Sequence, residues 1–189
     1  LKNNGKSKEL KASTIITATG MNEIEPVGLF CYGEFPNIIT QLQLDEKLKS
    51  KSLGNVNNVA IINCVNSRNE ERGCCNIGCL ASIKNAITIK ELNKDTKVYI
   101  FYRDINIEGE DYNYFKDAVN KYDIKLIRYP DDKQVEVIGN KKNGSLSLKA
   151  YDILIGKEFE INPDLVVLTT GFQGNPSVEK LKGLLKVSA

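Results

Sequence analysis

The sequence contains no histidine, and this absence limits the chemistry that is open to the protein. Without imidazole there is no histidine metal ligand and no Ser/His or Cys/His nucleophile pair. The side chain that most often moves protons near neutral pH is missing as well. Hydrolytic catalysis is therefore disfavoured.

Neither sign of charge is in large excess, because 26 Lys and Arg are balanced by 24 Asp and Glu, for a formal net charge of +2. Such a balance gives no strong positive field, so we expect no nucleic-acid partner. No segment reaches the roughly 20 consecutive apolar residues that cross a bilayer, and no signal-type apolar region follows the lysine-rich stretch 1–11. We therefore predict a cytoplasmic protein without membrane insertion.

The hydrophobic content of 41% in 189 residues is enough for a core of ordinary size. Apolar strands are expected at 59–64, 98–102 and 124–129, with amphipathic helices between them at 80–92 and 112–122. Strands separated by helices of this length predict a parallel sheet with right-handed crossovers.

The pattern changes after Pro130 to short alternating runs separated by turn residues. These runs, at 135–138, 146–148 and 153–155, predict an antiparallel meander. A fully apolar strand at 164–170 follows. Near the start of the chain, a β-branched run at 14–20 is expected to be a buried strand that ends in a turn, and 40–49 to be a short helix.

The expected fold class is therefore α/β: a Rossmann-like nucleotide-type domain with a parallel sheet, crossover helices and an antiparallel β-meander. In flavoproteins with two dinucleotide domains, the chain enters such a domain from the FAD domain and returns to it through strands that end in small-residue turns. We therefore expect three segments: the end of an FAD domain with an ordered connection (1–50), a Rossmann-like domain with the cysteine loop (51–170), and a return segment (171–189). This architectural analogy does not by itself fix function.

A glycine-rich turn is missing where such a domain would bind a nicotinamide dinucleotide. The G-x-G-x-x-G turn lets the backbone approach a pyrophosphate at the start of a helix. Here the turn after the strand at 59–64 reads Cys64-Val65-Asn66-Ser67-Arg68, and the first glycine is Gly73. We expect no nicotinamide binding.

Four of the five cysteines fall within sixteen consecutive positions: Cys64, Cys74, Cys75 and Cys79. Clustered thiolates select zinc or an iron–sulfur cluster, and the start of a helix directly after them stabilises negative charge. The adjacent pair Cys74 and Cys75 is unusual for structural zinc, whose paired ligands are normally about two to four residues apart. The alternative is that some are only small buried residues, as we expect for the isolated Cys31.

Four stretches of the chain, at 32–44, 64–86, 102–105 and 164–171, carry a family resemblance. The second stretch resembles the part of heterodisulfide reductase A subunits that reads C-V-G-S-R, then Y-C-S-x-x-C-C, then a helix with A-L-K-N-A. All four occur in the order of that family, and the resemblance extends from about Thr14 to Val187.

The resemblance implies an FAD-containing iron–sulfur electron-transfer subunit of thioredoxin-reductase-like build, whose cysteine loop holds a [4Fe–4S] cluster close to the flavin. It implies an oxidoreductase whose partners are other subunits of a heterodisulfide-reductase-type complex, with hydrogenase or formate dehydrogenase subunits as electron input. The family's FAD fingerprint is expected upstream of Leu1 and the rest of its flavin site downstream of Ala189. We therefore expect these residues alone to be inactive and not to retain FAD.

The resemblance also implies metal ligands. Cys64, Cys75 and Cys79 match family ligands, but the fourth ligand position, directly after the third, is Leu80. The tyrosine position of the family is Cys74. Either Cys74 replaces the missing ligand, which we favour, or the site holds an incomplete cluster or none. The predicted metal ligands are therefore Cys64, Cys74, Cys75 and Cys79.

The residues implied to line FAD in the full-length protein are small and lie at two turns: Thr19, Gly20, Thr170 and Gly171. The alternative is that they are ordinary tight turns. No catalytic residue is assigned.

Two roles are possible for Arg68, and two further functions are possible for the cysteine loop. Arg68 is expected to pair with Glu70 or Glu71 at the surface, or else to donate hydrogen bonds to the cluster. The loop could instead be a structural zinc knot in a docking domain. A flavoprotein disulfide reductase with a Cys74-Cys75 or Cys64-Cys75 dithiol is the remaining alternative.

Overall fold

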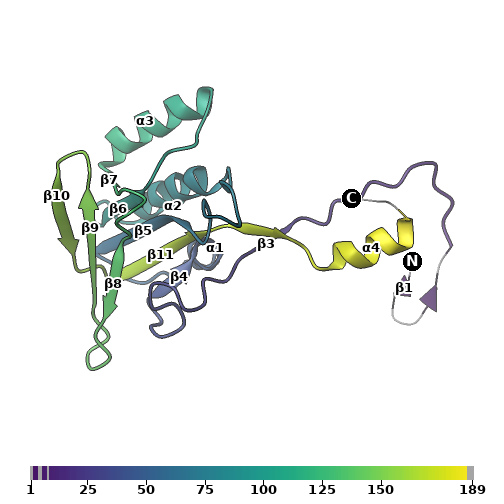
Figure 1. Cartoon of the computed structure of the whole chain (residues 1–189), viewed down its shortest axis with the longest axis horizontal. Helices are drawn as coiled ribbons and strands as arrows, with labels where there is room; N and C mark the ends of the chain where they lie inside the picture. Colours follow the sequence, from purple (N-terminus) through teal and green to yellow (C-terminus); the bar gives the residue numbers. More distant parts are fainter. Residues whose placement is uncertain (1, 4–5, 8, 187–189) are drawn as a thin grey trace. The chain divides into compact units, whose positions relative to one another are not determined.

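The computed structural model describes residues 2–3, 6–7 and 9–186, and the chain forms two compact units (Figure 1). The core unit is Glu23–Phe172, and the other unit takes its residues from Leu1–Asn22 and Gln173–Ala189. The outermost residues of the predicted segments 1–50 and 171–189, and the Val187 end of the family resemblance, lie outside the described residues. The division of the chain into these predicted segments stays a prediction.

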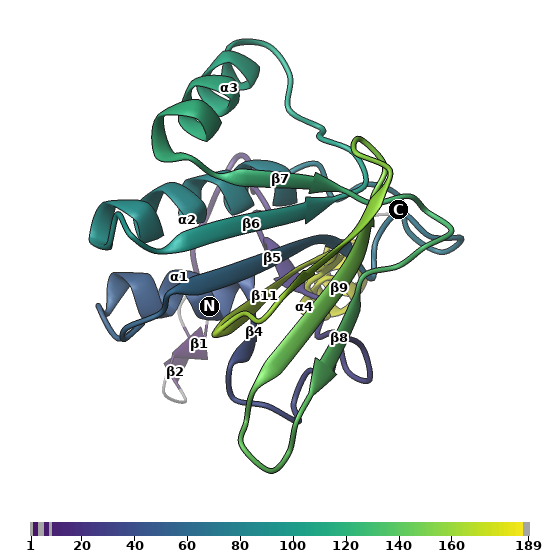
Figure 2. The ribbon, with the colours of Figure 1, turned by 90° about the vertical axis from the view of Figure 1, so that its left-hand side faces the viewer.

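Five parallel strands form the central sheet of the core unit, in the order β4-β11-β5-β6-β7 (Figure 2). They are β4 (Ile38–Thr40), β5 (Asn58–Val65), β6 (Lys97–Tyr102), β7 (Lys125–Arg128) and β11 (Leu165–Thr170). The two central strands, β5 and β11, are almost entirely buried, as continuous apolar runs covered on both faces should be.

Successive residues of these strands pack against different layers. Val59 and Ile61 of β5 face a cluster that includes α1 (Gln41–Lys49), α2 (Gly78–Leu92) and α3 (Glu110–Tyr122). Ala60 and Ile62 face a second cluster. That second layer is the meander of strands β8 (Glu136–Gly139), β9 (Leu146–Asp152) and β10 (Lys157–Ile161). The helices and the meander thus cover opposite faces of the sheet (Figure 2).

The predicted fold class is confirmed by this arrangement, since the parallel sheet, the crossover helices and the antiparallel meander are all present. The run 153–155, expected as the third meander strand, is instead the exposed turn between β9 and β10. Pairing of Lys157 with Asp152 places the reversal at these residues, so the third strand begins after Gly156.

Strands β3 (Met21–Glu23) and β12 (Phe172–Gly174) pair with each other, and each spans the sequence boundary of the units, with Glu23 and Phe172 in the core unit. The second unit contains the pair of β1 (Lys2–Asn3) with β2 (Lys6–Ser7). It also contains α4 (Ser177–Leu185), which has no buried residue. The expectation of a buried strand at 14–20 is wrong: Ile15 and Ile16 are 68% and 88% exposed, and no strand is formed. An apolar strand needs backbone partners and a covering layer, and in the described part of the chain nothing pairs with this run. No described helix combines the length and apolar character that a membrane span requires.

Candidate functional site

The cysteine loop, residues 64–79, connects the end of β5 to the start of α2 at the carboxyl edge of the parallel sheet. This edge is where open α/β sheets bind ligands. Cys79 is buried, Cys64 and Cys75 are half-buried, and Cys74 is exposed. The structure therefore places the four cysteines that are predicted to bind a metal at the edge of the sheet where this type of fold binds its ligand.

Burial raises the pKa of the Cys64 thiol, and it raises the pKa of Cys79 to about 11. The negative charges of neighbouring cysteines raise both pKa values further, so the thiols are close enough to affect one another's ionisation. Arg103 and Arg68 act in the opposite direction on Cys64. Without a metal ion, the buried thiols are thus kept protonated.

The cysteines do not form a finished ligand set. Among the described residues, no group of three or more His, Cys, Asp or Glu side chains is gathered closely enough to hold a metal ion. The assignment of Cys64, Cys74, Cys75 and Cys79 as ligands stays a prediction.

Three buried side-chain donors near the cysteine loop indicate whether its surroundings suit an iron–sulfur cluster. Asn63 Nδ2, Ser67 Oγ and Arg103 Nε have no hydrogen-bond partner within the described chain. Buried polar groups are normally satisfied, and sulfide and thiolate are acceptors that hydrogen bonds tune in iron–sulfur proteins. The donors and the thiols therefore fit an anionic iron–sulfur centre.

Cys74 and Leu80 share their surroundings. The Cys74 sulfur lies 3.4 Å from the backbone nitrogen of Asn76 and 3.5 Å from Asn106 Nδ2. Leu80 lines a cavity of about 430 Å³ together with Asn76 and Asn106. Cys74 and Leu80 therefore adjoin the same two residues, Asn76 and Asn106.

Gly78 allows Cys75 to approach the start of α2. A Cβ atom at Gly78 would lie 2.9 Å from the Cys75 sulfur and 2.6 Å from Thr169 Cγ2, closer than side chains tolerate. The Cys75 sulfur consequently lies at the first residue of α2.

A buried polar network joins the sheet to α1 and α2 beneath the loop. Ser82 is its centre, because its hydroxyl lies 2.6 Å from Asn63 Oδ1, 3.0 Å from Thr169 Oγ1 and 2.8 Å from the carbonyl of Gly78. Gln41 Nε2 donates to Ser82 and to Thr169. The network fixes the first turn of α2, and with it Cys79, against the end of β5.

Replacing Ser82 by alanine should lower the free energy of unfolding by about 1–3 kcal/mol, because it leaves buried polar partners unsatisfied. The exposed Ser13, for which no hydrogen bond is found within residues 2–3, 6–7 and 9–186, offers a matched Ser13→Ala control that should change little. Urea unfolding of both variants measures the difference. Equal midpoints for Ser82→Ala and the wild type would refute the role of the network.

The predicted flavin-lining residues belong to different units. Thr170 and Gly171 are buried in the core unit, where the Gly171 N–H donates to the carbonyl of Val65 and a Cβ at Gly171 would lie 3.3 Å from the carbonyl of Asn66. Thr19 and Gly20 belong to the other unit. Their contact with FAD stays a prediction.

Arg68 does not pair with Glu70 or Glu71 as expected. Its guanidinium lies 3.8 Å from a carboxylate oxygen of Asp104, which follows β6. The carboxyl ends of the neighbouring parallel strands β5 and β6 lie side by side. Arg68 therefore pairs with a residue that follows β6 and not with its neighbours in the sequence.

Glu23 is a half-buried carboxyl that the sequence pattern did not reveal. It accepts a hydrogen bond from the Thr40 hydroxyl, and its Oε1 is buried without a partner in the described chain. Burial raises the pKa of Glu23 above its usual value of 4.5, although Thr40 and the first N–H groups of α1 act in the opposite direction. No local motif marks it, because its partners lie 17 or more positions along the chain.

The raised pKa of Glu23 predicts how stability depends on pH. The protonated carboxyl tolerates burial, so its contribution is present below the unfolded pKa and is lost as pH rises through the folded pKa. Glu23→Gln keeps the neutral form at every pH. The stability of the variant relative to the wild type should therefore increase between about pH 4 and pH 7, as urea unfolding at several pH values would show. A difference that is constant with pH would contradict this.

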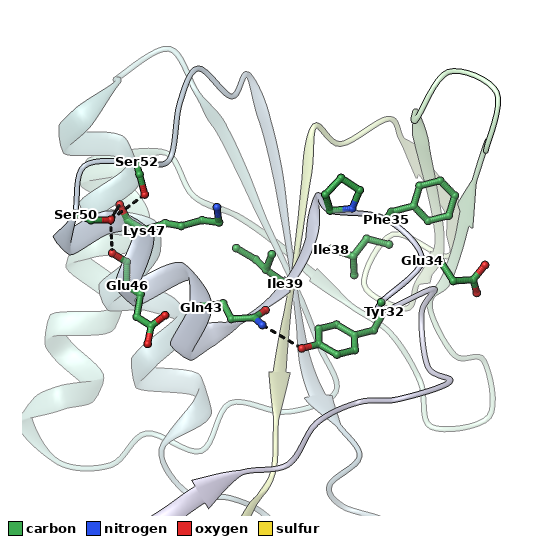
Figure 3. A pocket seen from close by; sticks show the side chains of 12 residues that line it. Tyr32, Glu34, Phe35, Ile38, Ile39, Gln43, Glu46, Lys47, Ser50 and Ser52 are labelled. Atoms are coloured by element: carbon green, nitrogen blue, oxygen red, sulfur yellow. Dashed lines mark hydrogen bonds between the residues drawn. The ribbon is translucent and has the colours of Figure 1, made fainter.

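A larger cavity lies away from the cysteine loop. Its volume is about 690 Å³, between the connection at 32–39 and α1, and Gln43 Nε2 donates to the Tyr32 hydroxyl within it (Figure 3). None of its charged lining residues is buried, and no cysteine lines it. It offers no chemistry comparable to that of the loop.

Comparison with known proteins gives a consistent result over nearly the whole chain. The A subunit of the H(2):CoB-CoM heterodisulfide,ferredoxin reductase of Methanothermobacter marburgensis is 33% identical over 197 residues, which cover 95% of this chain and 29% of that protein. The iron-sulfur A subunit of the CoB-CoM heterodisulfide reductase of Methanocaldococcus jannaschii is 31% identical, with 94% and 29% covered. The A subunit of the H(2)/formate:CoB-CoM heterodisulfide,ferredoxin reductase of Methanococcus maripaludis is 29% identical, with the same shares covered. The chain thus spans about 29% of the length of these curated relatives.

Other comparisons add the fold alone. No protein-family model matches the chain. The solved structure of FAD-bound DfoA, the cadaverine monooxygenase of desferrioxamine biosynthesis in Erwinia amylovora, has a TM-score of 0.50 at 13% identity. The likeness covers 87% of this chain and 46% of that one.

Proposed function

The chain is homologous to a segment of heterodisulfide reductase A subunits, and on this premise we propose that it forms the iron–sulfur module of an FAD-dependent oxidoreductase of that kind. The observation that carries the proposal is the cysteine loop at the carboxyl edge of the sheet. A nucleotide-binding fold would hold a dinucleotide there, but the glycine-rich turn is replaced by residues 64–68.

The proposed ligands are Cys64, Cys75 and Cys79, with Cys74 in place of the family's fourth ligand. When bound, a [4Fe–4S] cluster supplies one-electron transfer at a potential set by charge, hydrogen bonds and exposure. The chain's own contribution is to bring soft thiolates to the start of α2, where helix N–H groups stabilise negative charge. Asn63 and Ser67 supply buried donors at the same place.

In the whole protein, Thr19, Gly20, Thr170 and Gly171 are proposed to line FAD. Gly171 is in close contact with Asn66 and Ser67 of the cysteine loop, which supports a flavin near the cluster. Flavin would carry the two-electron chemistry and the cluster single electrons.

The proposed partners are the other subunits of a heterodisulfide-reductase-type complex, including an electron-input subunit of hydrogenase or formate dehydrogenase type. The names of the relatives support this class of partner, since they include hydrogen, formate and ferredoxin. Co-purification of the full-length protein with such subunits tests it.

Metal analysis separates the proposal from its two alternatives. A structural zinc knot predicts about one zinc atom per chain and no visible chromophore. A flavoprotein dithiol predicts that Cys75 titrates as a redox-active thiol with no metal bound. The cluster predicts iron and acid-labile sulfide in equal amounts.

A nicotinamide dinucleotide should not bind. The turn at 64–68 places Cβ atoms where a pyrophosphate needs bare backbone, so neither NADH nor NADPH should show saturable binding by fluorescence. A flavoprotein with an intact G-x-G-x-x-G turn serves as the positive control. Saturable quenching by either nucleotide would contradict the proposal that the site has a different ligand.

A further inference from the structure

One side chain from the neighbouring strand holds the backbone of the cysteine loop. Arg103 directly follows β6, and its side chain is only 12% exposed. Its Nη2 donates to the carbonyls of Cys64 and Ser67, at 3.2 Å and 2.7 Å, and its Nη1 to the carbonyl of Arg68 at 3.3 Å. A single planar guanidinium thus binds three of the first five carbonyls of the loop.

These hydrogen bonds bind a stretch of backbone whose conformation is unfavourable for residues other than glycine. Cys64, Asn66 and Arg68 have φ values of 64°, 50° and 54°, in the left-handed region that non-glycine residues avoid. Such a conformation persists only where surrounding contacts impose it. Arg103 binds the carbonyls of two of the three residues, Cys64 and Arg68.

The guanidinium is itself fixed in place. Its Nη1 lies 3.2 Å from a carboxylate oxygen of Asp131, and the main-chain carbonyl of Arg103 accepts a hydrogen bond from Arg128 Nε at 3.1 Å. The buried Tyr129 hydroxyl donates to the carbonyl of Asn63 at 2.8 Å, just before Cys64. The ends of β6 and β7 therefore form a rigid support for the end of β5 and the loop.

The loop also binds to itself through its backbone, because the Ser67 N–H donates to the carbonyl of Cys64 and the Arg68 N–H donates to the carbonyl of Gly73. Arg103 adds a permanent positive charge near Cys64, which favours an additional negative charge there.

We propose that Arg103 is a positioning residue of the metal centre, which sets the conformation of residues 64–68 and makes the centre easier to reduce. This inference rests on the proposed function. The effect of Arg103 on the conformation of residues 64–68 concerns the chain by itself, whereas its effect on reduction requires the cluster.

The test compares Arg103→Met, which removes both the charge and the hydrogen bonds, with Arg103→Lys, which keeps the charge but loses the planar fork. Arg72→Met is the matched control, because the Arg72 guanidinium bonds side chains of the loop, Asn66 and Glu71, and no carbonyl of residues 64–68. The first readout is amide hydrogen exchange of residues 64–68 in the metal-free chain. The second is the reduction potential after reconstitution with iron and sulfide.

In Arg103→Met, exchange at residues 64–68 should rise by about tenfold or more while the central strands stay protected, and the reduction potential should fall. Arg103→Lys should show faster exchange with a potential close to that of the wild type. Exchange in Arg103→Met equal to that of the wild type, or an equal effect in Arg72→Met, overturns the inference.

The two proposals fail in distinguishable ways. A wild-type chain that takes up no iron refutes the proposed function, and the exchange experiment then still decides whether Arg103 holds the loop. A wild-type chain that takes up iron, with an unchanged potential in Arg103→Met, refutes the effect on reduction alone. If Arg103→Met does not fold, exchange in Arg103→Lys decides whether Arg103 sets the conformation of residues 64–68, and wild-type exchange in Arg103→Lys overturns that effect.

Discussion

Replacing Cys75 by serine is expected to reduce the iron content of the reconstituted chain from about four atoms to less than one. The Cys75 sulfur lies against Gly78 at the start of α2, next to the loop that carries the other cysteines. A serine hydroxyl at this position is a hard, protonated group that does not replace a soft thiolate. Iron and acid-labile sulfide analysis after anaerobic reconstitution measures the loss.

Cys31 provides the matched control, because it is a free, half-buried cysteine outside the loop whose thiol donates to the carbonyl of Val137. Cys31→Ser should retain the iron content of the wild type. Wild-type iron content in Cys75→Ser, or an equal loss in both variants, would contradict the assignment of Cys75 as a ligand.

The second large effect concerns the fourth ligand. Cys74→Ser should lower the iron content to about three atoms or fewer, since a cluster with one missing thiolate loses an iron or does not assemble. Adding Leu80→Cys to this variant restores the family's ligand position. We expect the double variant to recover about four irons, because Cys74 and Leu80 both adjoin Asn76 and Asn106.

The serine variant and the double variant separate two explanations. Unchanged iron in Cys74→Ser would show that Cys74 is not a ligand. Loss in Cys74→Ser without recovery in the double variant would show that Cys74 is required for a reason that position 80 cannot supply. Tm measurements on both proteins check that folding is intact.

The core of the fold could be predicted from the sequence because its elements carry strong local patterns. Strands β5 and β11 are continuous apolar runs, as strands buried on both faces must be. Thr40 and Gln43 form a capping box that starts α1 where a helix was expected. The three-residue strand β4 was missed, because its pairing with β11 is a long-range contact that three residues cannot signal.

Two apolar runs were misread because periodicity does not say what covers a run. Ile153, Leu154 and Ile155 occupy a turn and are exposed, and Ile15 and Ile16 lie in an exposed stretch without strand partners in the described chain. Both have strand-like composition, and neither has a neighbour that completes a sheet.

The candidate site, like the fold, could be predicted only in part from the sequence. The cysteines were found because four thiols in one short stretch are a local signal. The hydrogen bonds that support the loop were not predicted, since Arg103 lies 36 to 39 positions from the Ser67 and Cys64 carbonyls that it binds, and Gln41 lies 128 positions from Thr169. Parallel strands place such distant residues side by side only after the sheet has formed.

The proposed function requires that the cysteine loop binds an iron–sulfur cluster. Anaerobic reconstitution of the chain with iron and sulfide, followed by metal analysis and a visible spectrum before and after dithionite, tests it most directly. We predict about four iron atoms per chain and a broad visible absorption that bleaches on reduction. Stoichiometric zinc with no visible chromophore would contradict the claim.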